Sequence, residues 1–121
     1  MNVFNEPIIT NAVMNHTISS AAIPIVNSFG YTVQAVYTGT PTGSLKLQGS
    51  NDKFEYVNAA QPQVPTNWND IKNSSFSITS AGICTWNVQG PFYNYVRLVF
   101  TDGSGGLSTA VLNATFNAKG Y

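Results

Sequence analysis

Apolar and polar side chains nearly alternate along residues 93–101, Tyr-Asn-Tyr-Val-Arg-Leu-Val-Phe-Thr. Successive residues of a β-strand point to opposite faces, so this pattern predicts a strand with one apolar face. The face that we expect in the core carries Val96, Leu98 and Phe100. The opposite face carries Tyr95, Arg97, Val99 and Thr101. A cation beside aromatic edges suits a sheet surface that meets water or another subunit.

The same period of two recurs from Gly30 onward, and clusters of turn residues separate the repeats. It predicts further strands at residues 31–38, 44–50, 68–71, 76–79, 83–88 and 107–118. The side chains expected on the apolar, inward faces are Leu45, Leu47, Phe76, Ile78, Cys84, Trp86, Val88, Ala110, Leu112, Ala114 and Phe116. Along residues 31–38, Tyr31, Val33, Ala35 and Tyr37 alternate with Thr32, Gln34, Val36 and Thr38. Turns about every 8 to 12 residues, without a 3.6-residue apolar period, predict an all-β protein. We expect a single antiparallel β-sandwich, jelly-roll-like, of about seven to eight strands.

The turn at residues 102–106, Asp-Gly-Ser-Gly-Gly, separates the last two predicted strands. Glycine-rich turns between two alternating segments are typical of β-hairpins. We therefore predict that residues 93–101 and 107–118 pair directly with each other.

Two segments lack a clear pattern. Residues 1–29 contain Pro7 and Pro24, and they are expected to form either an N-terminal arm on a neighbour or the first edge strands. Residues 30–121 are expected to form the sandwich domain. Residues 53–66 read as a long loop, and loops of this length often carry function or lie on a partner.

Charged side chains make up only 8% of the 121 residues, against roughly 25% in typical soluble domains. The formal net charge is zero, a state that favours association. The basic residues form no run, so we expect no nucleic-acid binding. No apolar stretch is long enough to span a membrane, and the N-terminus lacks the pattern of a secretory signal. We expect a protein that is made in a cytoplasm.

The residues able to perform chemistry are few, and we expect no enzyme, no cofactor and no metal site. His16 is the single histidine. Cys84 is the single cysteine, which excludes a disulfide within the chain, and it falls on the face expected in the core. A pair of Cys84 with His16 was the one catalytic arrangement to consider. Asp52 is better suited to cap its turn than to bind calcium, because only one carboxylate is present there. Residues 102–106 are better suited to a flexible hairpin turn than to a calcium or phosphate loop, because they carry one carboxylate and no following lysine or helix.

Aromatic residues offer two further sites. A subunit interface is predicted at Tyr93, Tyr95, Arg97, Phe54 and Tyr56, because tyrosine and arginine are enriched at interfaces. A platform for stacking sugar rings is the alternative, formed by Trp68 and Tyr56.

Several segments resemble, in order, the small β-sandwich virion proteins of bacteriophages. These are residues 43–52 (Gly-Ser-Leu-Lys-Leu-Gln-Gly-Ser-Asn-Asp), 65–71 (Pro-Thr-Asn-Trp-Asn-Asp-Ile), 81–82, 85–88 (Thr-Trp-Asn-Val), 95–101 and 114–120. The Asn-Asp and Tyr-Val-Arg motifs also resemble discoidin-like, galactose-binding sandwiches. Residues 53–64 look like an insertion relative to the phage pattern, and residues 1–29 match no part of it.

The resemblance implies a structural protein of the virion, such as a head-decoration, auxiliary capsid or fibre-associated component, with no catalytic residues. It implies that other virion proteins are the partners and that the chain forms a homo-oligomer, such as a trimer. Binding of host surface glycans is the alternative function.

Overall fold

The computed structural model describes residues 2–25, 28–52, 65–89 and 93–120, and within these the chain forms ten strands and no helix. In chain order they are β1 (Asn2–Val13), β2 (Ile18–Ser19), β3 (Ile23–Pro24), β4 (Ser28–Thr38), β5 (Gly43–Ser50), β6 (Asn69–Asp70), β7 (Phe76–Ile78), β8 (Gly82–Gln89), β9 (Tyr95–Asp102) and β10 (Val111–Gly120).

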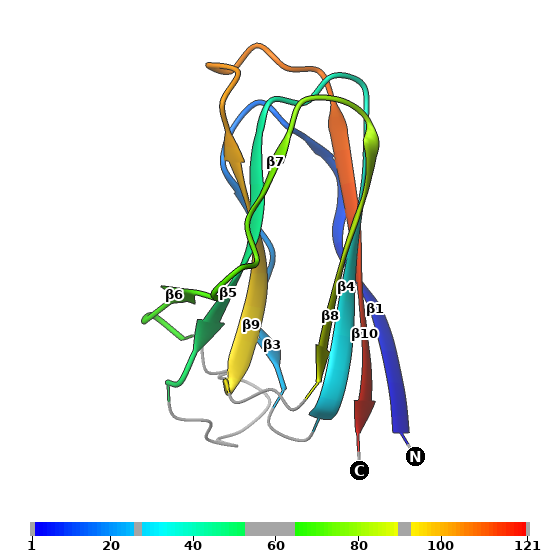
Figure 1. The fold of residues 1–121 in the computed structure, drawn as a ribbon, viewed down its shortest axis with the longest axis vertical. Coiled ribbons are helices and arrows are strands. Elements are labelled where there is room, and N and C mark those ends of the chain that lie inside the picture. Colours follow the sequence, from blue (N-terminus) through cyan, green and yellow to red (C-terminus); the bar gives the residue numbers. More distant parts are fainter. Residues whose placement is uncertain (1, 26–27, 53–64, 90–92, 121) are drawn as a thin grey trace, which may run out of the picture.

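The strands form two antiparallel sheets that lie face to face (Figure 1). One sheet has four strands in the order β1-β10-β4-β8. The other has six, with β2 and β3 along one side of β9, β5 on the other side, and β6 and β7 along β5. The chain changes sheet at six of the nine connections between these strands, as in a jelly roll. The predicted fold is therefore confirmed, and the strand number exceeds about eight because two edge positions are each divided into two short strands.

The predicted hairpin is wrong. Strand β9 pairs with β5, whereas β10 pairs with β1 and β4 in the other sheet. Residues 103–110 form the connection that crosses between the sheets (Figure 1). A glycine-rich segment permits a crossover as readily as a tight turn, since neither needs more than local backbone freedom.

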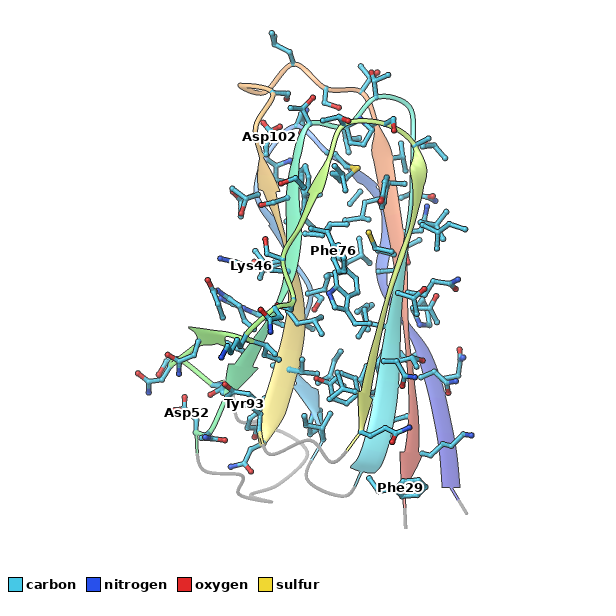
Figure 2. The ribbon with its side chains drawn as sticks, in the orientation of Figure 1. Phe29, Lys46, Asp52, Phe76, Tyr93 and Asp102 are labelled. Carbon is cyan, nitrogen blue, oxygen red and sulfur yellow. The ribbon has the colours of Figure 1, made fainter. Side chains whose placement is uncertain are left out.

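The predicted inward faces are confirmed for almost every strand. Leu98, Phe100, Leu45 and Leu112 are fully buried, and the remaining inward residues of β4, β5, β9 and β10 are also in the core. Phe76 is the exception, with 43% of its side chain exposed. It pairs with Leu45 and so points inward, but β7 lies at the edge of its sheet. Its ring contacts Trp86 edge to face, with 5.6 Å between the ring centres (Figure 2).

Each of the two divided edges has a serine between its two short strands, and that serine hydrogen-bonds to the neighbouring strand. Between β2 and β3, the Ser20 hydroxyl accepts a hydrogen bond from the Leu98 backbone N–H at 2.9 Å. Between β6 and β7, the Ser74 hydroxyl accepts one from the Leu47 N–H at 3.1 Å and donates to the Ile71 carbonyl at 2.7 Å. Both serines are buried. Each hydroxyl thus replaces the strand carbonyl that the break removes, which leaves no buried N–H without an acceptor at these two positions.

The strands of the first part of the chain, β1, β2 and β3, lie at sheet edges. β1 pairs with β10 over its whole length, with two shifts of register, between Pro7 and Ile9 and between Ile9 and Ala12. β2 and β3 pair with β9 in the opposite sheet. The first part of the chain therefore contributes one edge to each layer of the sandwich.

Candidate assembly surfaces

The outer side of the six-stranded sheet carries a hydrogen-bonded network of charged and polar side chains, which we call the charged face: Lys46, Gln48, Trp68, Asp70 and Arg97. The Arg97 Nε donates to the Gln48 Oε1 at 2.9 Å, and the Gln48 Nε2 donates to the Asp70 Oδ1 at 2.9 Å. The Lys46 Nζ lies 3.0 Å from the same carboxylate oxygen. The Arg97 guanidinium also stacks on the Trp68 ring, 4.3 Å from its centre. The polar side chains of the charged face therefore bind one another.

The electrostatics of this face agree with that geometry. The Gln48 amide, and then Lys46, hold the pKa of the Asp70 carboxyl below its ordinary value, because both stabilise the charged form. Partial burial lowers the pKa of Arg97. Figure 2 shows Lys46 on the outer side of β5, away from the core.

The outer side of the four-stranded sheet is uncharged over most of its area, and we call it the neutral face. Its side chains lie in rows across the strands, because paired residues point to the same side. One row is Asn5, Asn117, Thr32 and Asn87. The next is Pro7, Thr115, Gln34 and Thr85. Among the side chains that the structure describes, Lys119 at the end of β10 is the one charge on this face.

The neutral face ends in an apolar patch. Val13 pairs with Val111 and Val36 pairs with Ile83, all four on the outer side. Ile83 is 62% exposed, Val13 41% and Val36 38%. Exposed apolar groups beside uncharged polar rows are suited to contact with another protein surface.

The predicted interface residues do not form one exposed patch. Tyr95 is only 4% exposed, so it has little surface to offer a partner. Tyr93 packs toward the core, where its ring lies over Gly49. It is also near Tyr31, whose pKa is raised to about 12 by burial and by electrostatic interaction with Tyr93. Arg97 is engaged with Trp68 and Gln48. Phe54 and Tyr56 lie outside the described residues.

Trp68, the predicted sugar platform, has Arg97 over its ring and is partly buried. Its predicted companion Tyr56 lies outside the described residues. A different groove, of about 480 Å³, lies at the end of the neutral face near Lys119. It is lined by Phe29, Gly30, Tyr31, Thr32, Asn87, Val88, Gln89, Asn117 and Lys119. The Asn117 Oδ1 is buried there and accepts no hydrogen bond from the described residues.

The residues considered for chemistry have structural partners. The Cys84 sulfur lies 3.1 Å from the Tyr37 hydroxyl, and burial, together with that hydrogen bond, raises the pKa of Tyr37 to about 12. The His16 Nδ1 lies 2.7 Å from the Asn15 side chain. Within the described ranges no three His, Cys, Asp or Glu side chains gather as a metal site would require.

Both aspartates that we expected at turns are loop caps. Asp52 accepts hydrogen bonds from the backbone of Thr66 and Asn67 at 2.7 and 3.1 Å, and from the Asn67 side chain at 2.9 Å. Asp102 accepts from the Ser104 N–H and hydroxyl and from the Gly106 N–H. These bonds lower the pKa of both carboxyls. Asp52 thus joins the two ends of the segment between β5 and β6.

The neutral face was not predicted from the sequence as a surface. Its signal was present in the strands themselves, where Thr, Asn and Gln occupy the positions between inward residues on β4, β8 and β10. What could not be read from the chain was that these three strands are neighbours in one sheet. The part of the chain that the structure describes contains no helix long and apolar enough to cross a membrane.

Comparison with known proteins supports the fold and no closer relationship. No family model matches the sequence, and no curated protein matches it either. The SPBc2 prophage-derived protein YomS has a similar structure, with a TM-score of 0.57 and 8% identity over 98% of this chain and 95% of that one. The Tobacco streak virus coat protein has a TM-score of 0.47 and 10% identity, covering 99% of this chain and 87% of that one. A chitosan-binding module of a Paenibacillus sp. IK-5 chitosanase/glucanase has a TM-score of 0.43 and 15% identity, covering 93% and 92%. The similarity to YomS supports the fold of this chain and nothing closer.

Proposed function

We propose that this chain is a structural protein of a bacteriophage virion, a decoration, auxiliary capsid or fibre-associated component that assembles with itself and with other particle proteins and catalyses no reaction. The observation that carries the proposal is the neutral face, a broad uncharged sheet surface that ends in exposed Val13, Val36 and Ile83. The resemblance of residues 43–52, 65–71, 81–82, 85–88, 95–101 and 114–120 to phage virion sandwiches points the same way. The protein would be made in the host cytoplasm and would function in the virion.

Docking through the neutral face would depend on apolar contact and neutral hydrogen bonds. Desolvating amide and hydroxyl groups costs less than desolvating charges, so a partner can cover this surface without matching ion pairs. Because salt screens charge pairs and has little effect on such contacts, we expect affinity for the particle to change less than about threefold between low and high salt.

The test is binding of the purified protein to particles that lack it, measured by co-sedimentation. Thr115→Glu places a carboxylate in the middle of the neutral face and should weaken docking at least about tenfold, the equivalent of about 1.4 kcal/mol. Thr101→Glu is the matched control, because Thr101 is exposed on the outer side of the other sheet. Failure of the unmodified protein to bind the particles would refute the proposed function. Equal weakening by both substitutions would refute the role of the neutral face.

Binding of host glycans is the second candidate, and the groove beside Asn117 favours it. Its amide side chains, Asn87, Gln89 and Asn117, are suited to hydrogen-bond sugar hydroxyls, and Asn117 brings a buried acceptor without a partner in the described chain. A glycan array tests this function directly. Asn87→Ala should remove a signal that comes from the groove, whereas Trp68→Ala should remove one that comes from stacking on the tryptophan. A blank array would reject carbohydrate binding.

A further inference from the structure

Three of the four sheet edges carry features that block the addition of another strand. β1 contains Pro7, two register shifts and Asn11 in the left-handed region with a φ of 49°. The β2/β3 edge consists of two-residue strands, one ending in Pro24, and the β6/β7 edge consists of strands of two and three residues. Short strands, prolines and bulges are the usual means by which proteins keep sheet edges from pairing.

The fourth edge, β8, has none of these features. Its eight residues, Gly-Ile-Cys-Thr-Trp-Asn-Val-Gln, include no proline and no charge. Its pairing with β4 runs without a shift from Gly30 opposite Gln89 to Tyr37 opposite Gly82. No strand of the described chain pairs with its other side, and Figure 1 shows β8 as the last strand of its sheet. A straight strand of this length leaves a row of backbone N–H and C=O groups available to a partner.

Exposed apolar side chains surround this edge on both sides of the sheet. Ile83, on β8 itself, is 62% exposed on the outer side, and its partner Val36 is 38% exposed. On the inner side Phe76, 43% exposed, lies against Trp86 of β8 (Figure 2). Apolar surface next to free backbone groups is what strand addition buries.

We propose that β8 pairs antiparallel with β8 of a second copy of this chain, which joins two four-stranded sheets into one eight-stranded sheet across a twofold axis. This inference rests on the proposed function for its biological role, and it names the partner and the contact of self-assembly. A twofold contact places the same surface on both sides, so one contact completes the open edge of each subunit.

The absence of charge on β8 favours a second copy of this chain as its partner strand. When a strand pairs with the same strand of a second copy, each of its charges lies near the equivalent charge of that copy. Like charges directly opposite each other are destabilising. β8 carries no charge, and neither does β4, its neighbour in the sheet. Self-pairing of this edge therefore meets no electrostatic penalty. It also leaves the neutral face continuous over both subunits and available to the particle.

The test uses matched lysine substitutions and measures the dimer dissociation constant by analytical ultracentrifugation. Thr85→Lys places a cation on the β8 edge, whereas Gln34→Lys places one directly opposite it on β4, on the same face but away from the edge. Both positions are exposed. We expect Thr85→Lys to weaken dimerisation at least about tenfold and Gln34→Lys to change it less than about threefold. Asn87→Lys with Thr32→Lys is a second pair in the same arrangement, for use if the first edge variant does not fold.

Hydrogen exchange supplies an independent measurement. Amides of β8 that point away from β4 should gain protection as protein concentration rises, while those of the blocked β1 edge should not. A strictly monomeric protein at high concentration, equal effects of Thr85→Lys and Gln34→Lys, or β8 exchange independent of concentration would each overturn the inference. Particle binding distinguishes failure of this inference from failure of the proposed function. Dimers that form through β8 and never bind particles would refute only the virion role. Particle binding by a chain that does not pair through β8 would refute only this inference.

Discussion

The two outer faces of the sandwich use their polar side chains in opposite ways. On the charged face, Arg97, Gln48, Asp70 and Lys46 are hydrogen-bonded to one another, and Trp68 is covered by a guanidinium. On the neutral face, rows of Asn, Thr and Gln cross four strands and end at exposed Ile83 and Val36. The first face has satisfied its strongest polar groups within the chain. The second leaves weakly solvated groups that a partner can cover.

The difference teaches where a chain with few charges places them. Five basic and five acidic residues serve the whole molecule, and three of these ten lie in one network. The opposite sheet is built almost entirely from uncharged side chains. The neutral face is therefore left almost without charge, and it is this face that we propose for assembly.

The largest effect should come from the core on which both faces rest. Phe116 is 1% exposed and packs against Tyr31, with ring centres 5.5 Å apart. Phe116→Ala should lower the free energy of unfolding by about 3–5 kcal/mol, because it leaves a large cavity. Thr115→Ala, the outward neighbour on the same strand, should change it by less than about 0.5 kcal/mol. Urea unfolding measures both, and comparable losses would contradict the assigned inner and outer sides of β10.

The next effect should distinguish the two sheets by their edges. Among the described strands, the two edges that are divided into short strands both belong to the six-stranded sheet, and a serine completes the hydrogen bonding at each. Ser74→Ala or Ser20→Ala should each cost about 1–3 kcal/mol, since each leaves a buried backbone N–H without its acceptor. Ser75→Ala and Ser19→Ala, the exposed neighbours, should cost less than about 0.5 kcal/mol. Serines at 74 and 20 that are no more sensitive than their neighbours would show that the hydroxyls do not close the ladder.

A smaller effect should separate the two faces directly. Arg97→Ala removes the stacking on Trp68 and the hydrogen bond to Gln48, and should cost about 0.5–1 kcal/mol of unfolding free energy. Gln34→Ala, at an exposed position of the neutral face, should be close to neutral. The comparison uses the same denaturant titration. A cost for Gln34→Ala as large as that for Arg97→Ala would show that the neutral face is also bonded within the chain.

The smallest effect should appear in acid. Hydrogen bonds lower the pKa of Asp52, Asp70 and Asp102 below the ordinary value of 3.8, so folding favours their charged forms. Their contribution to stability is present above that value and is lost as the pH falls through the lowered pKa of each group. Unfolding free energy should therefore fall with pH below about pH 4. Asp52→Asn should make that decline shallower, and an unchanged slope would show that the Asp52 cap adds no stability.

The local pattern of the sequence predicted much of the fold. Alternation identified the inward residues of β4, β5, β9 and β10, and turns at short intervals identified the sandwich. It did not predict burial at two positions: Phe76 points inward on the edge strand β7 and is still exposed, and Tyr95 points outward on β9 and is still buried. The interface at Tyr93, Tyr95 and Arg97 stays a prediction, although Tyr93 and Tyr95 pack within the chain, and the neutral face was not predicted.

By itself, the sequence determined which side of each strand enters the core, because a period of two is a property of neighbouring residues. Tertiary structure alone decided that β9 and β10 lie in different sheets, since a loop of small residues permits either connection. It also decided which polar groups meet, as Arg97 and Gln48 do across 49 positions of the chain. Only strand order determines which outward side chains become neighbours. Long-range strand pairing therefore decided that the side chains of the charged face bind one another, whereas the neutral face is left for a partner.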